Sequence, residues 1–119
     1  MTQPVAIPRQ VLTLGTLAPQ GIESSTTILV RTDQVEIVEL TIPAGTAIPR
    51  YEAQGELILH CLEGDVTVRA GGERHDLLAG QLLYLLLGDP FSIYAAQDAR
   101  VLATIVAAKE GPRVELIGK

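Results

Sequence analysis

Short apolar segments recur along this chain at intervals of about 8 to 12 residues, separated by breaks rich in Gly, Pro and Asp. None of these segments sustains the 3.6-residue period of an amphipathic helix. The pattern predicts an all-β fold, either a sandwich or a barrel. We expect strands at residues 27–31, 34–42, 57–62, 65–70, 73–78, 81–87, 91–96 and 101–107.

Turn-forming glycines divide the middle segments from one another. Gly64 and the Gly71-Gly72 pair lie between segments 57–62, 65–70 and 73–78, where tight turns need positive φ angles. We therefore expect a three-stranded antiparallel meander with tight hairpins over residues 57–78.

Two segments, 82–87 and 101–108, are apolar at nearly every position instead of at alternate positions. An antiparallel strand normally keeps one face in water, so a strand that is apolar on both faces needs cover on both. In a chain this short, a second sheet covers one face and another subunit covers the other. We therefore expect a homodimer.

The length of 119 residues and the apolar content of 47% suffice for one domain with one core. We expect a single domain over residues 1–119, with its core at about 35–107. Segments 1–26 and 108–119 are expected to be edge strands or arms that lie on the dimer partner.

Charge and composition exclude several classes of partner. Nine Lys and Arg against 14 Asp and Glu give a net charge of −5, which opposes binding to nucleic-acid phosphates. Three Tyr, one Phe and no Trp are too few for platforms that stack bases. The longest apolar run, residues 82–87, is far shorter than the roughly 20 residues that span a bilayer. We expect neither a nucleic-acid nor a membrane partner.

The single cysteine, Cys61, cannot form an internal disulfide or belong to a multi-cysteine zinc site. The N-terminal residues lack the cationic start of a signal peptide. Both observations lead us to expect a reducing, cytoplasmic setting.

The middle of the chain, residues 35–107, resembles small single-domain cupins of the RmlC-like jelly-roll superfamily. The resemblance is carried by three stretches, Ile42-Pro43-Ala44-Gly45, Leu57-Ile58-Leu59-His60-Cys61-Leu62-Glu63-Gly64-Asp65 and Gly72-Glu73-Arg74-His75-Asp76-Leu77-Leu78-Ala79-Gly80-Gln81. Gly45 and Gly64 bracket the first cupin motif, and Gly80 and Gly88 have the separation of the second. The resemblance implies a cupin-type double-stranded β-helix, a jelly-roll barrel of two packed antiparallel sheets.

The metal ligands of the cupin motifs are absent from the same alignment. Tyr51 and Ala53 stand at the two histidine positions of the first motif, Leu57 at its glutamate and Phe91 at the histidine of the second. One Tyr beside Ala, Leu and Phe cannot form a cation cage. The resemblance therefore implies a metal-free cupin without a cofactor, whose cavity has become mostly apolar.

We expect these positions to form a ligand-binding site at the barrel mouth, and we expect no catalytic residues. By strand parity Cys61 shares the face of Leu57, and Tyr84 belongs to the same small set of aromatic residues as Phe91. The expected site comprises Tyr51, Ala53, Leu57, Phe91, Cys61 and Tyr84.

The favoured function is a small-molecule-binding or accessory protein that accepts a small, largely apolar molecule. One alternative is a metal-independent enzyme, similar to isomerase or epimerase members of the fold, that uses Tyr51, Tyr94 or Glu56 for acid–base chemistry. That enzyme needs His60 inside the barrel, whereas parity places His60 on the face opposite Leu57.

Two further alternatives remain open. The first is a purely structural oligomerisation domain with no ligand. The second is a residual metal site that recruits Glu56, His60 and His75, with a bulge near Gly55 turning Glu56 inward. Otherwise His60 is expected to pack in an interface, and His75 to lie in solvent beside Arg74 and Asp76.

Overall fold

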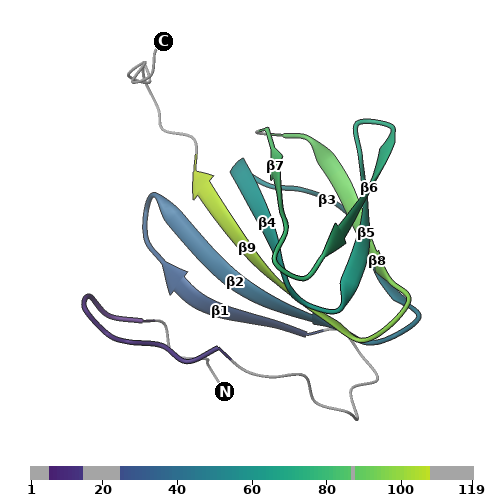
Figure 1. Ribbon diagram of the computed structural model, residues 1–119. Helices are drawn as coiled ribbons and strands as arrows, with labels where there is room; N and C mark the ends of the chain where they lie inside the picture. The colour runs from purple at the N-terminus through teal and green to yellow at the C-terminus, as the bar shows by residue number, and fades with distance from the viewer. Residues whose placement is uncertain (1–5, 15–24, 87, 108–119) are drawn as a thin grey trace.

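The computed structural model of the chain describes residues 6–14, 25–86 and 88–107 (Figure 1). Those residues form strands and contain no helix, so the all-β prediction is confirmed. The strands are β1 (Ser25–Arg31), β2 (Val35–Ile42), β3 (Thr46–Glu52), β4 (Gly55–Glu63), β5 (Asp65–Ala70), β6 (Glu73–Leu78), β7 (Leu82–Leu85), β8 (Pro90–Ala95) and β9 (Ala99–Ala107).

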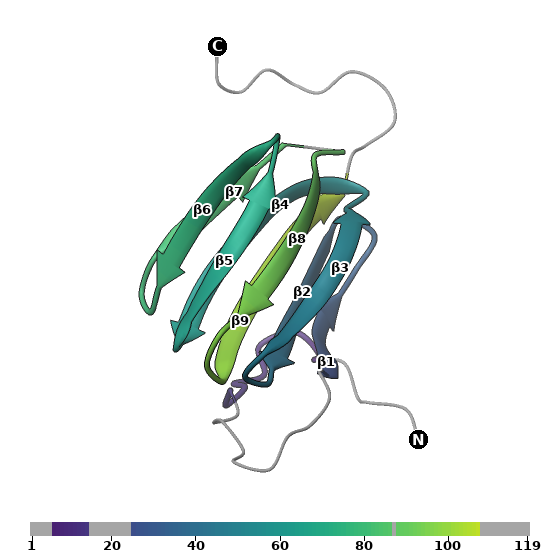
Figure 2. The same cartoon turned by 90° about the vertical axis from the view of Figure 1, so that its right-hand side faces the viewer.

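The strands form two antiparallel sheets that pack face to face. Figure 2 looks onto one sheet, with β3, β8, β5 and β6 in front of the strands of the other. Sheet A has the order β1-β2-β9-β4-β7, and sheet B has the order β3-β8-β5-β6. Consecutive strands therefore alternate between the sheets in much of the chain. The predicted architecture of two packed antiparallel sheets is confirmed.

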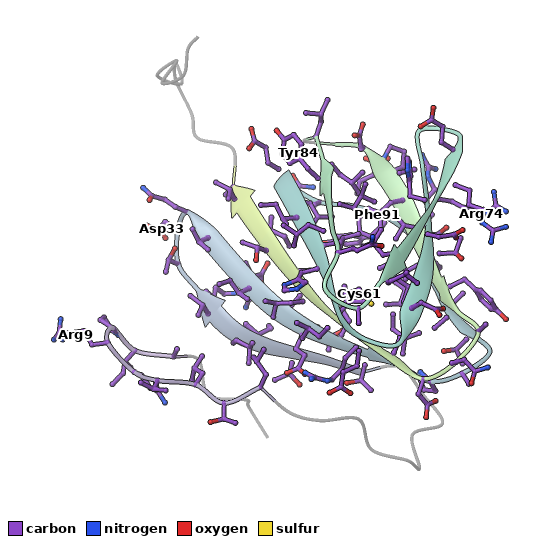
Figure 3. All side chains as sticks on the ribbon, viewed as in Figure 1. Arg9, Asp33, Cys61, Arg74, Tyr84 and Phe91 are labelled. Carbon is purple, nitrogen blue, oxygen red and sulfur yellow. The ribbon has the colours of Figure 1, made fainter. Side chains whose placement is uncertain are left out.

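Strand parity decides which side chains enter the space between the sheets. In β4, Leu57, Leu59 and Cys61 are buried, whereas Ile58 and His60 are only half-buried. Figure 3 shows Cys61 and Phe91 between the two sheets. The inward residues of both sheets make one continuous core: Val38, Ile42, Ala53, Leu57, Leu59, Cys61, Val66, Val68, Ala70, Leu77, Leu85, Phe91, Ile93, Ala95, Ala99, Val101 and Ala103.

The predicted meander over residues 57–78 is wrong in its first half. Strands β5 and β6 do form a tight hairpin, but β4 pairs with β7 and β9 in the other sheet. The chain changes sheet at Gly64, whose φ is +77° and whose Cβ position lies 2.4 Å from the Asp98 carbonyl oxygen. A side chain does not fit there, so the glycine serves the crossing between sheets rather than a hairpin.

One strand, β3, was not expected at all. It runs along the edge of sheet B and contains Pro49, which cannot donate a ladder hydrogen bond. The pairing with β8 shifts register between Ile48 and Tyr51, so Pro49 lies in an irregularity of an edge strand.

The predicted terminal segments are only partly within the described residues. Strand β1 forms an edge of sheet A, and the Ala6 amide donates to the Leu29 carbonyl oxygen at 2.9 Å. The segment 108–119, Leu87, and residues 1–5 and 15–24 lie outside the described residues. No helix in the described part of the chain has the length and apolar character needed to cross a membrane.

Candidate functional site

A cavity of about 350 Å³ lies between the two sheets, where β1, β2, β9 and β4 of sheet A face β3 and β8 of sheet B. Its wall is mostly aliphatic and aromatic. The lining residues are Thr26, Ile28, Arg31, Glu36, Val38, Leu40, Ile48, Pro49, Tyr51, Leu57, Leu59, Phe91, Ala103 and Ile105.

Two aromatic rings lie on the sheet B side of this cavity. Tyr51 in β3 and Phe91 in β8 are cross-strand partners, and their ring centroids lie 5.9 Å apart with an interplanar angle of 85°. This edge-to-face arrangement is a favoured geometry for aromatic pairs. Phe91 is buried, whereas half of Tyr51 is exposed, so the pair runs from the core to the mouth of the cavity.

An ion pair stands on the sheet A side of the mouth. Arg31 and Glu36 are cross-strand partners in β1 and β2, on the same inner face as Val38 and Ile105. Arg31 donates from both Nε, at 2.9 Å, and Nη2, at 2.5 Å, to the same Glu36 oxygen, Oε2. The two charges therefore neutralise each other at the rim of an otherwise apolar cavity.

A second, smaller hollow of about 210 Å³ adjoins the first. Four residues line both hollows, namely Arg31, Glu36, Tyr51 and Ile105. The remaining residues of the outer hollow are Thr32, Val35, Gln54 and Ala107. The ion pair and the Tyr51 phenol therefore mark the boundary between an apolar interior and a more polar vestibule.

The structure brings together three of the six expected site residues. Tyr51, Leu57 and Phe91 line the cavity, while Ala53 and Cys61 are buried in the core beyond it. Tyr84 lies elsewhere: it pairs with Ile58 on the outer face of sheet A and is 56% exposed (Figure 3). Parity explains its position, because its neighbours Leu83 and Leu85 oppose Leu59 and Leu57 on the inner face.

Comparison with known proteins rests on structure alone, because no family model and no curated protein matches this chain. A conserved protein of unknown function from Streptococcus pyogenes superposes with a TM-score of 0.75 at 19% identity, over 92% of this chain and 98% of that one. A cupin superfamily protein from Desulfitobacterium hafniense gives 0.72 at 15% identity, over 77% and 84%.

An RmlC-like cupin from Methanocaldococcus jannaschii, described as a double-stranded β-helix, gives a TM-score of 0.67 at 16% identity. That match covers 82% of this chain and 93% of the other. This chain has the cupin fold. Of the four positions that correspond to cupin metal ligands, Tyr51, Leu57 and Phe91 line one cavity and Ala53 does not.

The residues at the four cupin ligand positions do not fit a metal ion. Ala53, Leu57 and Phe91 have hydrocarbon side chains without a donor atom, and Tyr51 offers a single phenol oxygen. In residues 6–14, 25–86 and 88–107 no group of three or more His, Cys, Asp or Glu side chains is placed to hold a metal.

Apart from Tyr51, the residues required by the alternative functions do not line this cavity. Glu56 and His60 have the outward parity of β4, where His60 opposes Leu102 and Leu82. His75 is in β6, in weak contact with Glu73 at 3.6 Å. The bulge near Gly55 that the metal alternative requires is absent from the β4–β9 pairing, whose register is regular from Gly55 to Cys61, so Glu56 is not turned inward.

Cys61 is a core residue of the cupin barrel. It is fully buried, and its thiol donates to the carbonyl oxygens of Glu63 at 3.6 Å and Gly64 at 3.4 Å. Burial raises the pKa of the Cys61 thiol, and the Asp65 carboxylate raises it further. This environment disfavours the reactive thiolate.

Sequence reasoning missed the sheet A wall of the site, in particular Arg31 and Glu36. A signal was present: Glu36 shares the parity of Val38, Leu40 and Ile42, so it is a carboxylate among inward aliphatic positions. Its partner lies across a short Thr32-Asp33 turn, whose hydrogen bond from the Thr32 amide to the Val35 carbonyl oxygen sets the hairpin register.

Proposed function

We propose that this cupin-fold protein binds a small, largely apolar molecule in the cavity between its sheets. The observation that carries the proposal is a cavity of about 350 Å³ beside a continuous buried apolar core. This volume lies within the range of about 300 to 1,000 Å³ that is common for small-molecule sites. A mostly apolar wall with a few polar groups at the mouth is also typical of such sites.

A purely structural barrel explains the cavity less well. Unfilled volume costs about 24 cal/mol per Å³ in core-truncation series, so selection for packing alone favours larger side chains along the wall. Ala103, at the centre of sheet A, instead leaves the wall open beside Leu57 and Leu59.

The lining supports binding more than acid–base catalysis. Its ionisable side chains are Arg31, Glu36 and Tyr51, and the first two are engaged with each other. The histidine that the enzyme alternative needs, His60, is on the outer face of sheet A. A general acid or base has to lie within hydrogen-bond reach of the reacting group.

The proposal includes the absence of a resident metal, which elemental analysis of the purified protein tests directly. One metal ion per chain would contradict it. We also propose a cytoplasmic location, since the free Cys61 thiol fits a reducing compartment.

A matched pair of variants tests the binding proposal. Ala103→Leu places a larger side chain in the cavity, whereas Ala47→Leu places the same side chain on an exposed position of β3 outside it. A thermal-shift screen of small apolar compounds should find binders of the wild type. A compound at 100 times its Kd stabilises a protein by about 2.7 kcal/mol.

These stabilising shifts should disappear in Ala103→Leu and persist in Ala47→Leu. If no compound shifts the wild type, or if Ala103→Leu retains every shift, the cavity is not a binding site. The structural alternative would then be preferred.

A further inference from the structure

We infer that the ligand is an apolar molecule with one neutral hydrogen-bonding group, an alcohol or a primary amide, at its end, and that the Arg31–Glu36 pair selects this group. The inference rests on the proposed function of the cavity. It adds the chemical class of the ligand and assigns two specificity-determining residues.

The pair lies at the boundary between the two hollows. Arg31 and Glu36 line both the apolar cavity and the outer hollow, together with Tyr51. A molecule whose apolar body fills the inner cavity therefore presents its outer end to these side chains. The rest of the inner wall contains no charged residue.

The pair has hydrogen-bonding capacity beyond its own two contacts. A guanidinium has five N–H groups, and the two contacts of Arg31 with Glu36 both end on Oε2. Arg31 therefore keeps further donors, and Glu36 keeps Oε1 as an acceptor. Together they offer a donor and an acceptor at one place, which matches a hydroxyl or a primary amide.

The two charges of the pair disfavour charged ligand groups. A ligand carboxylate at this position meets the like charge of Glu36, and a ligand ammonium meets the like charge of Arg31. A neutral polar group avoids both repulsions and still makes hydrogen bonds with both partners. Binding sites commonly discriminate between ligands by repelling the wrong one in this way.

The pair is partly exposed, with 59% of the Arg31 side chain and 28% of the Glu36 side chain accessible to solvent. Water therefore weakens the repulsions, and we expect a preference of roughly tenfold, equal to about 1.4 kcal/mol. Glu36, the more buried of the two, is expected to contribute the larger part.

The test uses four probes that share a phenyl body: 2-phenylethanol, 2-phenylacetamide, phenylacetate and 2-phenylethylamine. Their Kd values are measured by NMR titration of the full chain at pH 7 and fixed ionic strength. The wild type should bind the alcohol and the amide about tenfold more tightly than the acid and the amine.

Two single variants should change this order in opposite directions. Glu36→Gln leaves the Arg31 charge alone, so phenylacetate should become the preferred probe. Arg31→Gln leaves the Glu36 charge alone, so 2-phenylethylamine should gain instead. The double variant should lose discrimination between acid and amine, which also checks that each single variant acts through charge.

A second ion pair supplies the matched control. Arg50 and Glu52 interact at 3.4 Å on β3, and neither lines the cavity. Arg50→Gln and Glu52→Gln should leave the order of the four probes unchanged. Circular dichroism of each variant confirms that its fold is retained.

Failure of the inference can be told apart from failure of the proposed function. Equal Kd values for all four probes, or the same order in Glu36→Gln and Arg31→Gln, would overturn the inference while binding in the cavity stands. Failure of all four probes to bind also overturns it, and the Ala103→Leu comparison then decides separately whether the cavity binds any molecule.

Discussion

Arg100 and Glu39 are buried charged side chains that lie on the outer face of sheet A. Arg100 donates from Nη1 to Glu39, and from Nη2 to Glu63 Oε2 at 2.9 Å. These contacts raise the pKa of Arg100, with the Glu63 hydrogen bond as the main cause. Its Nε is buried and has no hydrogen-bond partner in the described part of the chain.

Arg100→Met should destabilise the fold by about 3 to 5 kcal/mol, because it leaves a buried carboxylate without its partner. Urea unfolding followed by circular dichroism measures this loss. Arg74→Met removes an exposed partner of Asp76 and should cost at most about 1 kcal/mol. If the two substitutions lowered the free energy of unfolding equally, the burial of the Arg100 ion pair would contribute little to stability.

Cys61 should resist thiol reagents in the folded protein. Its raised pKa and full burial keep the thiol protonated and inaccessible. Because the folded pKa exceeds the unfolded one, the associated stability is present at neutral pH. It falls as the pH rises past the ordinary thiol pKa.

Labelling by a maleimide should follow global unfolding in a urea series. Labelling that is rapid in the absence of urea would contradict this account of Cys61.

At the residue scale, the site residues that could be predicted from the sequence are those at a fixed spacing from the cupin glycines. Tyr51, Leu57 and Phe91 were found from the cupin glycines, and the structure places them around one cavity. Arg31 was not found, because its inward direction depends on the register irregularity between Ile28 and Val30 in β1. A one-residue irregularity reverses strand parity and cannot be read from the sequence.

At the scale of elements, hydrophobic pattern located most strands but not their partners. The bounds of β5 and β6 were predicted correctly, since both are delimited by glycine turns. Strand β3 was missed because Pro49, Arg50 and Glu52 make it look like a loop. Sheet membership depends on contacts between distant segments, so the change of sheet at Gly64 was also missed.

Gly55, the first residue of β4, should not tolerate a side chain. A Cβ added there lies 2.0 Å from the Val106 carbonyl oxygen of β9. Gly55→Ala should therefore push β4 away from β9 and cost about 3 kcal/mol, at the upper end of ordinary single substitutions.

Gly71→Ala is the control, because its added Cβ meets open space and only its φ of +62° is unfavourable. That change should cost about 1 to 2 kcal/mol. Chemical denaturation gives the free energy of unfolding of both variants. A smaller loss for Gly55→Ala than for Gly71→Ala would mean that β4 and β9 separate easily.

At the scale of the whole molecule, the outer face of sheet A is the surface on which we expect the homodimer to form. Ile58, Leu82, Tyr84, Leu86 and Leu102 are half-buried or exposed side chains of this face or of its β7 edge. The charges of Arg100 and Glu39 are paired within the same face. Exposed apolar side chains gathered on one face commonly mark a protein interface.

A second copy of this chain therefore remains our prediction for the occupant of that face. Tyr84→Glu should convert a dimer into a monomer, as measured by light scattering coupled to size exclusion. Tyr94→Glu introduces the same charge at a comparably exposed tyrosine on sheet B and should leave the mass unchanged. A wild-type monomer would refute the homodimer prediction.

The central place of β9 in sheet A has a consequence for how the protein acquires its fold. β9 is the last of the described strands in chain order, yet it pairs with both β2 and β4. During synthesis, sheet A therefore stays divided into the β1–β2 and β4–β7 pairs until β9 is made, whereas every strand of sheet B precedes β9 in the chain. Such long-range closure favours slow folding. Until β9 is in place, β2 and β4 each keep an unpaired edge, and unpaired strand edges make an incomplete chain prone to aggregation.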